Sequence, residues 1–149
     1  MKTDAKKIWE AWGQANALYT TWASERNINS YQLMVLYAID GQDTITQKMI
    51  AEYTGLSKQT VNTVIRGLKK DGYIELISGI SDRREKQIKF TAKGMEYSSK
   101  ILTPLYELEN NIFEMIGEAR IKGMINDIKL FTTIFEKEMR EQKNEQGEF

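Results

Sequence analysis

The chain of 149 residues contains no cysteine, no histidine and only one proline, Pro104. Without cysteine it can form neither a disulfide nor an oxidation-sensitive thiol. The lack of both residues disfavours a high-affinity zinc or copper site and excludes a catalytic triad that needs histidine. No apolar run approaches the roughly 18 residues of a membrane helix, and no apolar segment follows the basic N-terminus as in a secretory signal. We therefore expect a cytoplasmic protein that uses no metal or cofactor and does not enter a membrane.

The formal net charge of zero conceals an uneven distribution of charge along the chain. Residues 46–94 contain 10 lysines and arginines against 5 aspartates and glutamates, which gives this segment a net charge of +5. The segments before and after it carry −1 and −4. A positive middle within a neutral chain indicates one surface that faces a polyanion, although a chance partition of charge would look the same.

The segment 45–94 has the pattern of a winged helix-turn-helix. A short helical pattern ends in a turn at Gly55, and a second helix is predicted over residues 58–71, where apolar side chains recur at helical spacing. Gly72 stops this second helix. Residues 73–90 then predict two strands that fold back around a polar, basic turn. The positive segment of the chain is thus also the one with a nucleic-acid-binding pattern.

The outward side of the helix at 58–71 is polar, because Val61, Val64, Ile65 and Leu68 occupy its core-facing positions. Amide side chains can pair with adenine, arginine and lysine with guanine, and the threonine methyl group can contact thymine. A solvated helix face would have a similar composition, but its place behind a tight turn favours base contact. The candidate DNA-contacting residues here are Ser57, Lys58, Gln59, Thr60, Asn62, Thr63 and Arg66.

The turn between the two predicted strands concentrates positive charge. Arg83 and Arg84 lie at the turn, and Lys86 extends the charge along the returning strand. A guanidinium group is favoured in a narrow minor groove, and Asp82 can hold the loop by pairing with a neighbouring arginine. An ordinary charged hairpin tip, which discourages edge-to-edge aggregation, is the alternative. We favour DNA contact, because the tip belongs to the same domain as the polar helix face.

Long amphipathic regions flank this segment on both sides. One predicted helix covers about residues 4–26, and two more follow the strands, at 92–116 and 118–142. Pro104 is expected to kink or divide the first of these two. Apolar stripes of this length have no obvious partner within so small a monomer, so we expect them to pair with a second copy of the chain.

This pattern divides the chain into two regions. We expect a winged helix-turn-helix domain over residues 30–94 and a helical dimerisation region over 1–29 and 95–149. Within the winged domain, Ser30 is predicted to cap a short buried helix at 31–39, and a short strand is predicted at 44–46. The fold class is therefore mainly α with a small β-hairpin wing.

The first two helices are rich in aromatic residues. Packing in the core and at the dimer interface is the default explanation. The alternative is an apolar pocket for a small aromatic or lipophilic effector, with hydroxyl groups and one arginine as polar anchors. The candidate ligand-contacting residues are Trp12, Trp22, Arg26, Tyr31 and Tyr37.

Two short motifs give a more specific indication. Asp82-Arg83-Arg84-Glu85-Lys86 and Phe90-Thr91-Ala92-Lys93-Gly94 resemble the D-x-R-x-K wing signature and the L-T-x-x-G helix start of the MarR family, bacterial regulators named after multiple antibiotic resistance. The order of elements over nearly the whole chain is also similar. Phe90 stands where the family usually has leucine.

The resemblance implies a homodimer that binds double-stranded DNA at a pseudo-palindromic operator, as a repressor in the usual case. It also implies that Arg84 enters the minor groove with Asp82 bracing it, and that a small ligand releases the protein from DNA. A winged-helix module that docks a protein is the alternative function. An enzyme is disfavoured, because the residues offer no nucleophile, acid–base pair or metal site.

Overall fold

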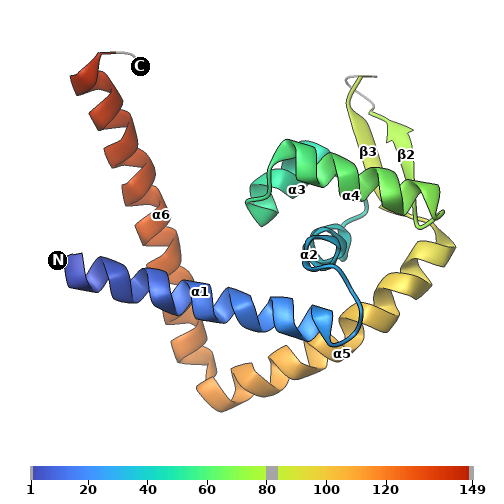
Figure 1. Cartoon of the computed structure of the whole chain (residues 1–149), viewed down its shortest axis with the longest axis horizontal. Coiled ribbons are helices and arrows are strands. Elements are labelled where there is room, and N and C mark those ends of the chain that lie inside the picture. The colour runs from blue at the N-terminus through green and yellow to red at the C-terminus, as the bar shows by residue number, and fades with distance from the viewer. Residues whose placement is uncertain (1, 80–83, 148–149) are drawn as a thin grey trace. The chain divides into compact units, whose positions relative to one another are not determined.

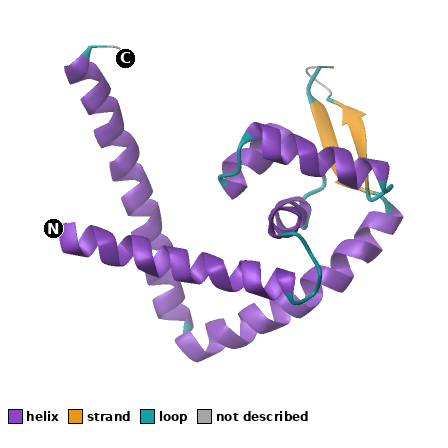
Figure 2. Cartoon of the chain, viewed as in Figure 1, coloured by secondary structure: helices purple, strands orange, loops and turns teal. Residues whose placement is uncertain are grey.

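The computed structural model describes residues 2–79 and 84–147, which form six helices and a small three-stranded sheet (Figures 1 and 2). This is the mainly α fold with a small wing that the sequence predicts. The elements, in chain order, are α1 (Lys2–Ser24), α2 (Ser30–Ile39), β1 (Ile45–Thr46), α3 (Gln47–Thr54), α4 (Lys58–Lys70), β2 (Ile74–Ser78), β3 (Lys86–Phe90), α5 (Ala92–Ile116) and α6 (Glu118–Gln146).

The chain divides into two compact units, Met1–Thr103 and Pro104–Phe149. The first unit contains α1 to β3 and the beginning of α5, and the second contains the rest of α5 and all of α6. Pro104 lies at this division, yet it does not end α5, which continues to Ile116. A proline removes one backbone hydrogen bond from a helix, and the bonds on either side can sustain the helix through that position.

The sheet has the strand order β1-β3-β2, and both pairings are antiparallel. Ile88 on the central strand pairs with Ile45 on one side and Leu76 on the other, and its side chain is fully buried. On the opposite face of the hairpin, Lys89 pairs with Glu75, and their charged atoms lie 3.3 Å apart. This alternation places one face of the hairpin in the core and leaves the other in solvent.

Short capping contacts define where the helices of the first unit begin. The α2 helix is capped by Asn29, whose Oδ1 accepts hydrogen bonds from the backbone N–H groups of Tyr31 and Gln32. The prediction that Ser30 is the cap is wrong by one residue. The side chain of Asn29 accepts the free N–H groups, and Ser30 is the first helical residue. Thr46 caps α3, because its Oγ1 accepts a hydrogen bond from the N–H of Met49.

A close backbone contact joins the end of α4 to the beginning of α5. Thr91 caps α5 by accepting the Gly94 N–H at 3.0 Å, and its hydroxyl donates to the Gly72 carbonyl at 2.6 Å. The Tyr73 carbonyl accepts the Thr91 N–H and lies against Gly94, where an added Cβ would sit 1.7 Å from that oxygen. We call this contact the α4–α5 joint. Only glycine fits at position 94.

We expect Gly94→Ala to lower the free energy of unfolding by about 3 kcal/mol or more, because the new methyl group meets backbone atoms that cannot rotate away. Gly13→Ala is the matched control: nothing lies within 4 Å of its added Cβ in the middle of α1. That variant should gain about 0.5–1 kcal/mol from the better helix propensity of alanine. Urea unfolding measures both. Equal stability of the two variants would contradict the close contact at Gly94.

Candidate nucleic-acid interface

The turn between α3 and α4 is tight and internally hydrogen-bonded. Gly55 ends α3 in the left-handed conformation, with a φ of 71°, which a glycine adopts without strain. The Thr54 hydroxyl donates to the Ile50 carbonyl at 2.7 Å and accepts the N–H of Leu56 at 3.2 Å. The two helices are therefore held at a defined angle, as in a helix-turn-helix.

The α4 helix has one buried face and one exposed polar face. Val61, Ile65 and Leu68 are at most 2% exposed, so they anchor α4 in the core. Of the residues at this helix that are predicted to contact DNA, the exposed ones are Ser57, Lys58, Gln59, Asn62, Thr63 and Arg66.

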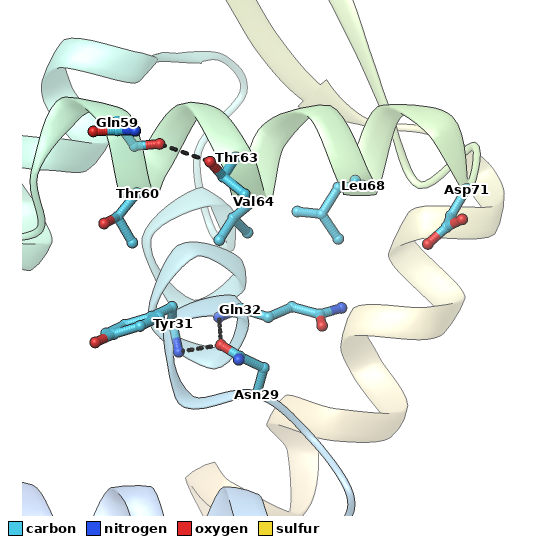
Figure 3. Close-up of a pocket in the computed structure, with 10 residues that line it drawn as sticks. Asn29, Tyr31, Gln32, Gln59, Thr60, Thr63, Val64, Leu68 and Asp71 are labelled. Atoms are coloured by element: carbon cyan, nitrogen blue, oxygen red, sulfur yellow. Dashed lines mark hydrogen bonds between the residues drawn. The ribbon is translucent and has the colours of Figure 1, made fainter.

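Thr60 differs from these six residues. It is half-buried, its N–H donates to the Ser57 Oγ at 3.1 Å, and its own Oγ1 accepts a hydrogen bond from the Ser57 hydroxyl at 2.9 Å. Figure 3 shows its side chain on the side of α4 that faces α2. The first turn of α4 thus uses Thr60 as part of its capping arrangement, and the polar face is carried by its neighbours.

Two further lysines belong to the exposed face. Lys69 and Lys70 in the last turn of α4 are exposed. Like Lys58 and Arg66, they form no ion pair with any residue that the structure describes. Neither lysine is among the DNA-contacting residues predicted from the sequence. The helical period could have found them, because positions three and four after Arg66 share its side of the helix.

The described part of the wing brings two predicted residues together. Arg84 and Lys86 are both exposed near the end of the hairpin, and the Gly79 N–H closes the hairpin on the Glu85 carbonyl at 2.8 Å. The Lys86 ammonium also donates to the Ser78 hydroxyl across the two strands. Asp82 and Arg83 lie outside the described residues. In Figure 1, β2 and β3 extend past α4 on the side away from α2.

The five candidate ligand-contacting residues lie in different surroundings. Trp22 and Arg26 contact each other: the Arg26 guanidinium lies 4.0 Å from the indole centroid and donates to the Trp22 carbonyl. Trp12 borders a shallow depression on α1, and Tyr37 is half-buried on α2. Tyr31 borders a groove of about 440 Å³ between α2 and α4, which Figure 3 shows in close-up.

One side of this groove is linked to α5. Gln32 of α2 donates to the Tyr97 hydroxyl at 2.9 Å, and the Tyr97 ring stacks on Tyr73 with centroids 4.0 Å apart. Burial, more than the nearby Tyr73, raises the pKa of Tyr97 above its ordinary value of 10. The phenol therefore stays neutral at physiological pH and keeps its place in this contact.

Other kinds of site find no support in the described residues. None of their acidic side chains gather in groups of three that could hold a metal ion. None of the described helices is both long and apolar enough to cross a membrane. What the first unit does present is an exposed, cation-bearing helix face beside the base of a basic hairpin.

Comparison with known proteins agrees with this arrangement. A MarR family model matches residues 27–85. The HTH-type transcriptional regulator SarZ of Staphylococcus aureus is 26% identical over 117 residues, which cover 77% of this chain and 76% of SarZ.

Solved structures extend the likeness to the whole fold. A MarR family regulator from Neisseria meningitidis superposes with a TM-score of 0.84 at 26% identity, covering 94% of this chain and 99% of that one. BpsR of Bordetella bronchiseptica, whose DNA binding is regulated by 6-hydroxynicotinic acid, has the same fold, with a TM-score of 0.67 at 16% identity over 86% of this chain and 91% of its own. These relatives agree with the expectation that the chain is not an enzyme. The chain is therefore similar to MarR family transcriptional regulators, in its winged segment by the family model and over nearly its whole fold by these relatives.

Proposed function

We propose that the protein is a homodimeric repressor that binds a pseudo-palindromic operator through α4 and the wing and is released by a small-molecule effector. The observation that carries this proposal is the exposed face of α4. Its amides and threonine stand beside four cations that have no ion-pair partner among the described residues. Such a face suits a groove lined with hydrogen-bonding base edges and phosphates.

Within this face, the residue types divide the work between sequence reading and affinity. Gln59 and Asn62 carry amides that can bond two atoms of one adenine. Lys58 lies in the first turn of α4, and an ammonium group there suits phosphate rather than base contact. Arg66 can serve either purpose. The proposed contact set is completed by Ser57, Thr60 and Thr63 on α4 and by Asp82, Arg83, Arg84 and Lys86 in the wing.

The proposed dimer rests on apolar surface that each unit exposes. In the first unit, Trp9 and Leu18 on α1 are 75% and 70% exposed. In the second, α6 exposes about half of each of Ile128, Phe131 and Phe135, with the two phenyl rings 5.7 Å apart. Apolar surface on this scale marks an interface. Two winged units in a two-fold dimer then match half-sites spaced by about one helical turn, roughly 34–36 Å.

Repression and release follow from where the dimer would bind. A protein that covers promoter DNA excludes other proteins from it. The DNA binding of BpsR responds to a small aromatic acid. We propose that a small ligand controls the DNA binding of the present protein in the same general way.

The wing contact can be tested with Arg84→Ala. Loss of a guanidinium from the minor groove should weaken operator binding by about 1–3 kcal/mol and leave the dimer folded. Arg140→Ala is the control, because Arg140 is an exposed arginine of α6 outside the proposed contact set. Operator DNA is first selected from genomic fragments with the wild-type protein, and titration in a gel-shift assay then gives the affinities. A folded Arg84→Ala variant with wild-type affinity would remove Arg84 from the contact set. Failure of the wild type to select any sequence would favour the protein-docking alternative.

The readout face can be tested by comparing selected sequences. Gln59→Ala and Asn62→Ala should relax base preference more than they lower non-specific affinity, because amides bond base edges. Lys58→Ala should weaken binding to all sequences nearly equally. It should also reduce the slope of log affinity against log salt concentration by about one. Asn16→Ala on α1 serves as the amide control. Recovery of the wild-type motif with both amide variants would show that other residues read the operator.

The dimer can be tested with a charge on the apolar face of α6. Phe135→Glu should produce a monomer or an unfolded chain and abolish operator binding, because burying an unpaired carboxylate in an interface is costly. Thr133→Glu places the same charge almost on the opposite side of α6, where Thr133 is exposed, and should remain dimeric. Light scattering at micromolar concentration gives the mass. A stable Phe135→Glu monomer that still binds one half-site tightly would overturn the two-fold arrangement.

A further inference from the structure

The groove between α2 and α4 lies entirely within the first compact unit and has a volume of about 440 Å³ (Figure 3). That size falls in the range of roughly 300–1,000 Å³ usual for small-molecule sites. The groove is distinct from the surroundings of Trp22 and Arg26, since neither residue lines it.

The floor of the groove is formed by apolar residues of α4. Val64 and Leu68 lie one turn apart on α4, and both point toward α2 in Figure 3. Gly67 has no side chain to fill the space, and even an added Cβ would meet nothing within 4 Å. Tyr31, which is 49% exposed, borders the groove at the opposite end from Asp71. Two aliphatic side chains beside an open space suit a planar, apolar ring system.

The charge of the groove is one-sided. Asp71 at the end of α4 is the one charged residue among those that line it, and no lysine or arginine does so. The Asp71 carboxylate forms no ion pair with any residue that the structure describes. Since Asp71 also lies at the negative end of the α4 dipole, the groove favours a cation over an anion.

The nearby cation, Lys93, is directed elsewhere. Its ammonium donates to the backbone carbonyl of Asp71 at 2.7 Å and lies 4.9 Å from the centroid of the Tyr73 ring. It thus bonds the main chain of the α4–α5 joint and leaves the Asp71 carboxylate available.

We propose that this groove binds a planar aromatic cation, with its ring on the Val64–Leu68 floor and its positive group on the Asp71 carboxylate. Gln59 and Thr63 line the edge of the same groove and also belong to the proposed DNA-reading set. The ligand and DNA therefore compete for these residues, a consequence that rests on the proposed function.

Three compounds of one shape test the charge preference: 2-naphthamidine as the cation, 2-naphthamide as the neutral form and 2-naphthoate as the anion. In calorimetric titration of the full-length protein, the amidine should bind at least about fivefold more tightly than the naphthoate. The reason is that an amidinium pairs with a carboxylate through two parallel hydrogen bonds. Equal or tighter binding of naphthoate would overturn the proposal. Loss of naphthoate binding in Arg26→Ala would then assign the acid to the Trp22–Arg26 surroundings.

Variants locate the amidine in the groove. Asp71→Asn keeps the size of the side chain and should weaken amidine binding by about threefold to fivefold without changing naphthamide binding. Asp127→Asn, which removes an exposed carboxylate from α6, is the control. Circular dichroism verifies that each variant is folded. Wild-type amidine affinity in folded Asp71→Asn would refute the assignment.

Competition with DNA is measured separately in a gel-shift assay. The amidine should lower operator affinity for the wild type at about threefold to fivefold lower concentration than for Asp71→Asn, a difference that binding of the amidine to DNA itself would not produce. An amidine that binds the groove without affecting DNA affinity would overturn the competition. If the protein binds no operator even without ligand, the proposed function fails, and calorimetry still decides whether the groove takes a cation.

Discussion

Burial of one face of α4 is the constraint on which the rest of the winged unit depends. Val61, Ile65 and Leu68 are almost completely buried, so α4 cannot rotate about its axis without exposing them. Exposing even one such side chain costs about 1.5–3 kcal/mol. Because the helix is held in this orientation, the amides and cations between Lys58 and Lys70 face solvent. The same orientation turns Thr60 and Val64 toward α2.

The α4–α5 joint fixes the beginning of α5 relative to the end of α4. Gly94 packs against the Tyr73 carbonyl, and Thr91 bonds backbone groups on both sides of the contact. The Tyr73–Tyr97 stack and the Gln32–Tyr97 hydrogen bond then tie the same region to α2. The exposed helix face is therefore positioned by contacts that involve both α2 and α5, which suits a surface that must match the spacing of DNA grooves.

The long helices at the two ends of the chain differ from α4, because many of their apolar side chains remain exposed. Leu18 and Phe135 stay exposed where Leu68 is buried. A short helix within a compact unit finds its cover among neighbouring elements, whereas long helices such as α1 and α6 extend beyond them. The proposed second copy of the chain is the simplest cover for both.

Local rules determined much of this protein from its sequence alone. Helical spacing predicted α4 and its buried stripe, and Gly55 and Gly72 marked the turns, because these signals act within about four residues along the chain. Tertiary packing decided the rest. The groove joins Tyr31 to Asp71, and the joint places Gly94 on Tyr73, across 40 and 21 positions of the chain respectively. Such contacts depend on how whole elements pack against one another, which local periodicity does not specify.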